Sequence, residues 1–110
     1  MASSLTKKLK PVVDRVCLIA CGSFNPPTIM HMRLLEQCRD QLTQEGFEVT
    51  GGILSPVGDG YKKKGLMPAL HRVHMCEAAA SESTWIKCDT WEAKQEQHIL
   101  TRVVLERFSS

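Results

Sequence analysis

The stretch that decides the fold is residues 12–31, which read "VVDRVCLIAC" followed directly by "GSFNPPTIMH". Its first half is β-branched and apolar with few interruptions, which is typical of a strand buried on both faces of a parallel sheet. Its second half holds a glycine, two prolines, a threonine and a histidine, which is more than a strand-to-helix turn requires. We therefore expect this turn to hold a ligand.

The residues that follow continue the alternation of helix and strand. Residues 28–45, "TIMHMRLLEQCRDQLTQE", carry apolar side chains at helical spacing, with Thr28 as a credible N-cap and Gly46 as a credible residue after the helix end. Residues 47–55, "FEVTGGILS", predict a second strand that contains two glycines. The first half of the chain thus predicts a strand, a helix and a second strand.

The second half repeats this order. A loop rich in Gly and Pro over 56–68 precedes a predicted helix over 69–83, a short strand over 84–91 and a third helix over 92–108. Arg72, near the start of the second helix, is expected to form a structural ion pair. Three strand–helix units predict an α/β fold with a parallel sheet and right-handed crossovers.

Composition indicates an ordinary globular chain. It has 110 residues, a net charge of +2 and 43% hydrophobic residues. That charge is too small to indicate nucleic acid or an anionic membrane as a partner, and no apolar run approaches the roughly 20 residues of a membrane helix. We expect a flexible tail over 1–11, which lacks the apolar segment of a secretory signal, and a single domain over 12–110.

The five cysteines predict reduced, structural thiols of a nuclear or cytosolic protein. They are Cys17, Cys21, Cys38, Cys76 and Cys88, and no two have C-x-x-C spacing. A zinc site would need closely paired ligands, so we expect no metal centre. Cys17 and Cys21 lie in the first apolar run and are expected to be small buried side chains.

The turn at 22–31 lies at the carboxyl end of the first strand, where ligands bind in open α/β sheets. Gly22 allows close approach, Ser23 offers a hydroxyl, and the helix start from Thr28 to His31 presents unpaired N–H groups suited to a phosphate. His31 can direct an imidazole N–H at the same phosphate. Taken alone, these residues fit a turn with a capping threonine and a surface histidine equally well. The pattern is neither a Walker loop nor G-x-G-x-x-G.

Four stretches together resemble a known family. They are "ACGSFNPPT", "GGILSPVGDGYKKKGL", "HRVHMCEAA" and "DTWEAKQ", and Thr28 and His31 fill the (T/H)-x-x-H step of the nucleotidyltransferase superfamily. Within it, the chain resembles the N-terminal half of eukaryotic nicotinamide/nicotinic acid mononucleotide adenylyltransferases over about residues 15–105. This resemblance implies a Rossmann-like sheet with flanking helices.

The resemblance also implies an activity. AMP would pass from ATP to nicotinamide or nicotinic acid mononucleotide, forming NAD or its deamido form and pyrophosphate, with Mg²⁺ accompanying ATP. No protein nucleophile is needed, and catalysis rests on positioning and charge neutralisation. Homo-oligomers and a nuclear or cytoplasmic location would also agree with the resemblance.

Individual residues acquire roles by the same resemblance. His31 becomes the catalytic residue at the ATP phosphates, and Lys64 meets the same phosphates. Trp91 and Thr101 match positions close to the nicotinamide. The full set of implied binding residues is Gly22, Ser23, Phe24, His31, Lys64, Trp91, His98 and Thr101, and no metal ligand is implied.

Several of these residues also have ordinary structural interpretations. Lys62–Lys64 could be a solvated basic loop or a nuclear-import patch. Trp91 could be a core aromatic residue, and Thr101 a residue on a helix surface. We expect Trp85 to belong to the core. His98 stands where the family usually has an aromatic residue that stacks on nicotinamide, so weaker nicotinamide binding is expected.

The chain lacks two later motifs of the family, a G-x-D turn and an I-S-x-T-x-x-R phosphate-binding segment. Family members are considerably longer. An alternative interpretation therefore remains open, in which the chain is a catalytically inactive truncated form that binds nucleotide weakly or pairs with a full-length partner.

Overall fold

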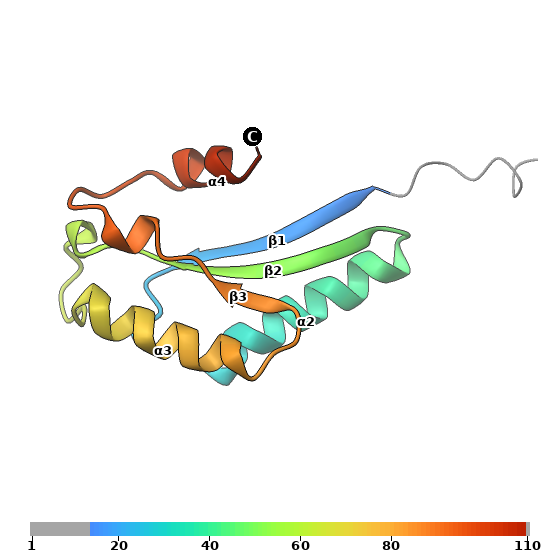
Figure 1. Cartoon of the computed structure of the whole chain (residues 1–110), viewed down its shortest axis with the longest axis horizontal. Coiled ribbons are helices and arrows are strands. Elements are labelled where there is room, and N and C mark those ends of the chain that lie inside the picture. The colour runs from blue at the N-terminus through green and yellow to red at the C-terminus, as the bar shows by residue number, and fades with distance from the viewer. Residues whose placement is uncertain (1–13, 110) are drawn as a thin grey trace, which may run out of the picture.

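The computed structural model describes residues 14–109 (Figure 1). The expected tail over 1–11 and the first residues of the first expected strand lie outside this range. None of the described helices is long and apolar enough to cross a bilayer. The elements are β1 (Arg15–Gly22), α2 (Ile29–Gln44), β2 (Glu48–Pro56), η1 (Asp59–Tyr61), α3 (Ala69–Ser81), β3 (Ile86–Cys88), η2 (Glu92–Lys94) and α4 (Thr101–Ser109), where η1 and η2 are short 3₁₀ helices.

The three strands form a parallel sheet in the order β1-β2-β3, which confirms the predicted α/β, Rossmann-like fold. Because both crossovers move in the same direction across the sheet, right-handed connections place α2 and α3 on one face. Figure 1 shows these two helices together below the strands and α4 above them. The carboxyl ends of the strands meet at one edge, where Gly22 pairs with Pro56 and Leu54 with Cys88.

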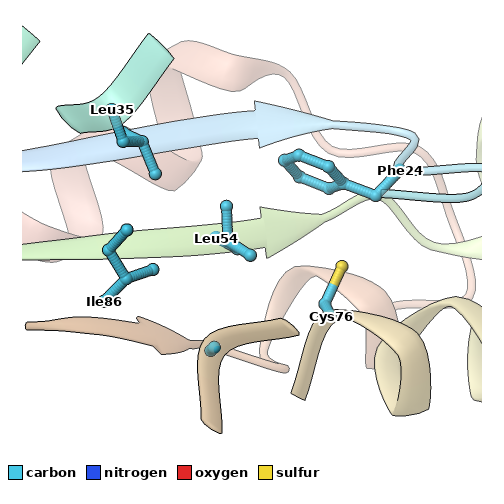
Figure 2. Packing of buried hydrophobic residues seen from close by; sticks show 6 residues of the cluster. Phe24, Leu35, Leu54, Cys76 and Ile86 are labelled. Atoms are coloured by element: carbon cyan, nitrogen blue, oxygen red, sulfur yellow. The ribbon is translucent and has the colours of Figure 1, made fainter. Parts of the chain in front are cut away.

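The core lies between the sheet and α2 and α3 (Figure 2). Its buried residues are Phe24, Leu35, Leu54, Cys76, Ala80 and Ile86, and Trp85 packs against them as expected. The expectation that the first strand is buried on both faces is wrong, because residues of β1 are half-buried or exposed. Cys17 is accordingly exposed and Cys21 only half-buried, since α2 and α3 both cover the same face of the sheet.

The first two predicted helices are confirmed. Thr28 is the N-cap of α2, and Gly46 follows its end with a φ of 95°, in the left-handed region that favours glycine. The second predicted helix, over 69–83, corresponds to α3.

The third strand is shorter than the predicted 84–91. The Ser83 hydroxyl accepts hydrogen bonds from the backbone N–H groups of Trp85 and Ile86, at 3.2 and 3.0 Å, which delays the start of β3. After β3, the Asp89 carboxylate accepts the backbone N–H of Trp91 at 2.9 Å, so the chain turns instead of extending. Side-chain bonds to the backbone thus limit β3 at both ends.

The predicted helix over 92–108 is wrong in its first half. Residues 92–94 form only η2, and α4 begins at Thr101. A Cβ on Gly58 would lie 2.7 Å from the carbonyl oxygen of Gln95, and one on Gly60 would lie 2.6 Å from that of Glu96. The backbone of residues 95–98 therefore packs directly on these two glycines. This long-range contact outweighs the helical spacing of the apolar residues.

We predict that Gly60→Ala destabilises the fold. The added Cβ would meet only backbone atoms, at 2.6–2.7 Å, so the 95–98 segment would have to move, at a cost of about 1–3 kcal/mol. Thermal unfolding followed by circular dichroism should show a lower Tm. The matched control is Gly51→Ala, whose Cβ would lie at an ordinary 3.7 Å from the nearest atom. Equal Tm values for the two variants would contradict the prediction.

Candidate functional site

The candidate site lies at the carboxyl edge of the sheet and begins with the turn after β1. Phe24 adopts a left-handed backbone conformation with a φ of 46°, which is strained for a residue with a side chain. Its ring is 3% exposed and belongs to the core, and this burial offsets the strain. The carbonyl of Gly22 accepts the N–H of Val57 at 2.9 Å, which joins the turn to the loop after β2.

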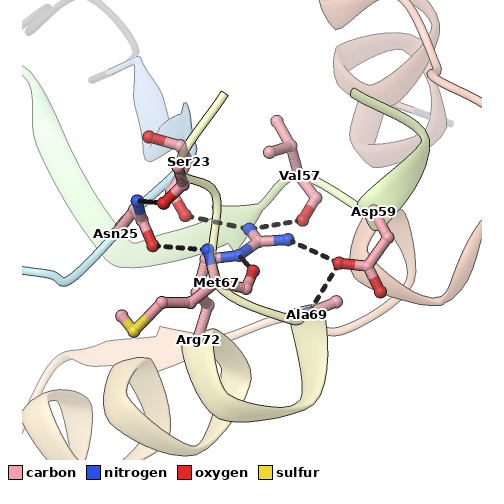
Figure 3. Close-up of polar contacts among 8 residues, drawn as sticks. Ser23, Asn25, Val57, Asp59, Met67, Ala69 and Arg72 are labelled. Atoms are coloured by element: carbon pink, nitrogen blue, oxygen red, sulfur yellow. Dashed lines mark hydrogen bonds and ion pairs between the residues drawn. The ribbon is translucent and has the colours of Figure 1, made fainter. Parts of the chain in front are cut away.

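Arg72 connects these loops from below (Figure 3). Its guanidinium is fully buried. It donates to the carbonyl oxygens of Met67 at 2.7 Å, Ser23 at 2.9 Å and Val57 at 2.7 Å. Its Nη2 lies 3.4 Å from a carboxylate oxygen of Asp59. The predicted structural ion pair of Arg72 is therefore confirmed, and it is part of a larger network.

The turn is also bonded to the lysine-rich loop through Asn25. Its amide nitrogen donates to the carbonyl of Gly65 at 2.9 Å, and its amide oxygen accepts the N–H of Met67 at 2.9 Å. Lys64, the residue before Gly65, is exposed. Its backbone is thus held beside the turn while its side chain faces solvent.

His31 lies in the first turn of α2 and is half-buried. The backbone N–H of Thr28 donates to its Nδ1 at 2.8 Å, which is one arm of a capping box. Because Nδ1 accepts this bond, the neutral ring carries its proton on Nε2. The ring of Phe24 packs edge-on against the imidazole, with 5.0 Å between centroids. These two contacts fix the orientation of the ring.

The third part of the edge is the segment after β3. Asp89 holds the N–H of Trp91 and forms an ion pair with Arg107 of α4. The guanidinium of Arg107 also lies 4.8 Å from the centroid of the half-buried Trp91 ring. Trp91 is therefore held by contacts with its own turn and with α4, and it does not belong to the main core.

The remaining expected residues, His98 and Thr101, are both exposed. The His98 ring is 5.0 Å from that of Tyr61 in η1, and Thr101 is the first residue of α4. The structure thus connects Gly22–Phe24, His31 and the loop of Lys64 through the hydrogen bonds and the ring contact of the turn. Trp91, His98 and Thr101 follow one another along the neighbouring segment.

Comparison with known proteins shows the family of the chain. Residues 19–107 match the family model described as Cytidylyltransferase-like. The chain belongs to the cytidylyltransferase-like family. It is 50% identical to a nicotinamide/nicotinic acid mononucleotide adenylyltransferase of Arabidopsis thaliana, over 86% of this chain and 40% of that protein. Identity is 53% to one of Bos taurus (82% and 32%) and 45% to one of Saccharomyces cerevisiae (96% and 27%).

The chain spans between 25% and 40% of the length of such curated relatives. The four stretches of sequence that carry the family resemblance form the turn after β1, the loop after β2, the start of α3 and the segment after β3. Within residues 14–109, no three His, Cys, Asp or Glu side chains form a group that could hold a metal ion.

Sequence reasoning missed Glu92 in this cytidylyltransferase-like site. Its carboxylate is 2% exposed and accepts a hydrogen bond from the buried Ser55 hydroxyl at 3.0 Å. Burial raises the pKa of Glu92, while the hydrogen bond from Ser55 and the charge of His98 oppose that rise. Burial, followed by the charge of Glu92, likewise raises the pKa of the Cys21 thiol. The available signal was an acidic residue directly after Trp91, which the helical pattern assigned to the predicted helix over 92–108.

The network around Arg72 generates one prediction. Arg72→Lys keeps the charge but loses the planar arrangement of donors, leaving buried carbonyl groups unpaired at a cost of about 3 kcal/mol or more. Urea unfolding should show a much lower midpoint. The control is Arg102→Lys, because Arg102 pairs with Glu106 on the surface, where we expect a change within about 0.5 kcal/mol. Similar losses in both variants would disprove the role of Arg72.

A second prediction concerns pH. Because the folded pKa of Glu92 is raised from its ordinary 4.5, the folded chain binds more protons than the unfolded chain between these two values. The free energy of unfolding therefore falls as pH rises through this window. Glu92→Gln keeps an acceptor for Ser55 and should weaken that fall, whereas exposed Glu96→Gln should leave it unchanged. Urea titrations across the window measure both, and parallel curves for wild type and Glu92→Gln would refute the assignment.

Proposed function

We propose that this chain supplies phosphate-binding and base-binding residues for the transfer of AMP from ATP to nicotinamide or nicotinic acid mononucleotide. The products would be NAD or its deamido form and pyrophosphate. One observation carries the proposal: the turn after β1 leads into α2 with His31 held by Thr28, so that Nε2–H and the N-terminal N–H groups of the helix are available as donors. The identity to relatives that bear this enzyme name supports it.

The reaction needs no nucleophile from the protein. A 5′-phosphate oxygen of the mononucleotide forms a bond to the α-phosphorus of ATP, and the bond from that phosphorus to the bridging oxygen breaks. Negative charge then develops on the leaving pyrophosphate. Mg²⁺ would enter with ATP as part of the substrate and would neutralise phosphate charge. His31 would donate Nε2–H to a phosphate oxygen, and Lys64 would supply a positive charge from the adjoining loop.

The nicotinamide end of the substrate is assigned to the segment after β3. Trp91 is half-buried and oriented by Asp89 and Arg107, which suits a fixed aromatic surface for a flat ring. His98 and Thr101 are exposed and would approach the same ring. Because an imidazole offers less stacking area than an indole, we expect nicotinamide binding to be weaker than it would be with tryptophan at position 98.

The proposal also covers the cellular location and the oligomeric state of the protein. The chain would act in the nucleus or cytoplasm and would form homo-oligomers, in agreement with the resemblance of its sequence. Gel filtration with light scattering measures the oligomeric state directly.

The central test is nucleotide binding and turnover by the 110-residue chain. We expect isothermal titration calorimetry to detect ATP in the presence of Mg²⁺, and an assay with nicotinamide mononucleotide to detect NAD. His31→Ala should weaken ATP binding by about ten-fold or more, because it removes a hydrogen bond to a charged group. His74→Ala, on the exposed face of α3, is the control. ATP binding that is unchanged in His31→Ala would overturn the proposed role of this residue.

The lysine loop allows a sharper comparison. Lys62, Lys63 and Lys64 are all exposed, so charge alone does not separate them. Only Lys64 is assigned to the phosphates, so Lys64→Ala should lower ATP affinity several-fold more than Lys63→Ala in the same calorimetric titration. Equal losses would indicate a general electrostatic effect of the loop and would contradict the specific assignment.

A further inference from the structure

Two cysteines meet beneath the sheet, outside the proposed nucleotide-binding groups. Cys76 lies on α3 and is fully buried in the core cluster. Cys88 is the last residue of β3 and packs against the same cluster. Figure 2 shows Cys76 directed from its helix towards the sheet. Both cysteines are free, and their side chains lie close enough for each to shift the pKa of the other.

Their surroundings give the two thiols different chemical roles. Hydrogen bonding with Cys76 lowers the pKa of Cys88, against the opposing effects of burial, Glu77 and Asp89. The same interaction, together with burial, raises the pKa of Cys76, which the charge of Arg72 only partly opposes. Because the thiolate is the nucleophilic form, and because Cys88 is half-buried whereas Cys76 is fully buried, Cys88 would be the attacking sulfur and Cys76 the resolving thiol.

Cys88 is also reachable from solvent. It is half-buried and lines a shallow groove of about 360 Å³ together with Glu77, Ala80 and Lys87. A second groove, on which Cys17 and Asp89 lie, also reaches Cys88. Cys88 therefore borders solvent at two grooves, where a small oxidant can approach it, whereas Cys76 is fully buried.

We propose that Cys76 and Cys88 form a dithiol modification site, which a peroxide converts to a disulfide between α3 and β3. The site combines the burial of one thiol, the partial exposure of the other and their packing together at the interface of α3 and β3. The site does not depend on the proposed nucleotide chemistry.

The reaction balances in two steps. The Cys88 thiolate attacks one peroxide oxygen, the O–O bond breaks, and after uptake of a proton the products are a Cys88 sulfenic acid and water or an alcohol. The Cys76 sulfur then attacks the sulfenic sulfur, an S–S bond forms, and water leaves with the Cys76 proton. Two thiols are oxidised by two electrons in total, and the peroxide is reduced by the same two electrons.

The test uses the whole chain and hydrogen peroxide. After treatment of the folded protein, remaining thiols are blocked with iodoacetamide and the protein is digested without reduction. We expect a linked peptide pair containing Cys76 and Cys88, a loss of two alkylatable thiols from the five in the chain, and full recovery after dithiothreitol. Folded protein in which peroxide leaves both cysteines alkylatable, or links other cysteines, would overturn the proposal.

Variants separate the two roles. In Cys76→Ala the resolving thiol is absent, so Cys88 should accumulate as a sulfenic acid that dimedone labels. Cys38→Ser removes an exposed thiol on α2 and should leave disulfide formation unchanged. Circular dichroism confirms folding of each variant before treatment. Dimedone labelling mainly at Cys17 or Cys38 in Cys76→Ala would contradict the assignment of Cys88 as the reactive thiol.

Discussion

The structure depends on how one buried positive charge is satisfied. A guanidinium enclosed by protein is costly unless its donors are paired, and Arg72 pairs them with three backbone carbonyls and a carboxylate. Two of these carbonyls, from Ser23 and Val57, belong to the loops after β1 and β2. The cost of burying the charge therefore becomes a constraint on the shape of the site. Loops held in this way are ordered by the protein itself.

Much of the fold could be predicted because its signals are local. The apolar first strand, the helical spacing of α2 and the N-cap at Thr28 each depend on residues close together in sequence. The turn around His31 was predictable for the same reason, since an N-cap threonine and a strand-to-helix turn are short motifs. For Arg72, an ion pair could be expected, but its carbonyl partners come from loops that only the folded sheet brings together.

The predictions that failed depend on long-range contacts. Residues 95–98 leave the helical path because their backbone packs on Gly58 and Gly60, far earlier in the chain. Cys17 was expected to be buried because it lies in an apolar run. Hydrophobic periodicity, however, does not indicate which face of the sheet the helices cover. Glu92 was missed because its buried partner, Ser55, lies on another strand. In each case the deciding residue is distant in sequence and ordinary in type.

The hydrogen bond from Thr28 to Nδ1 of His31 has a consequence for the chemistry open to this side chain. With its lone pair at Nδ1 occupied by the backbone, the imidazole cannot take a proton there while the cap is intact. It can hold an anion but cannot act through that nitrogen as a general base. The helix cap thus limits what His31 can offer at this edge of the sheet, which is a hydrogen-bond donor at Nε2 and no acceptor.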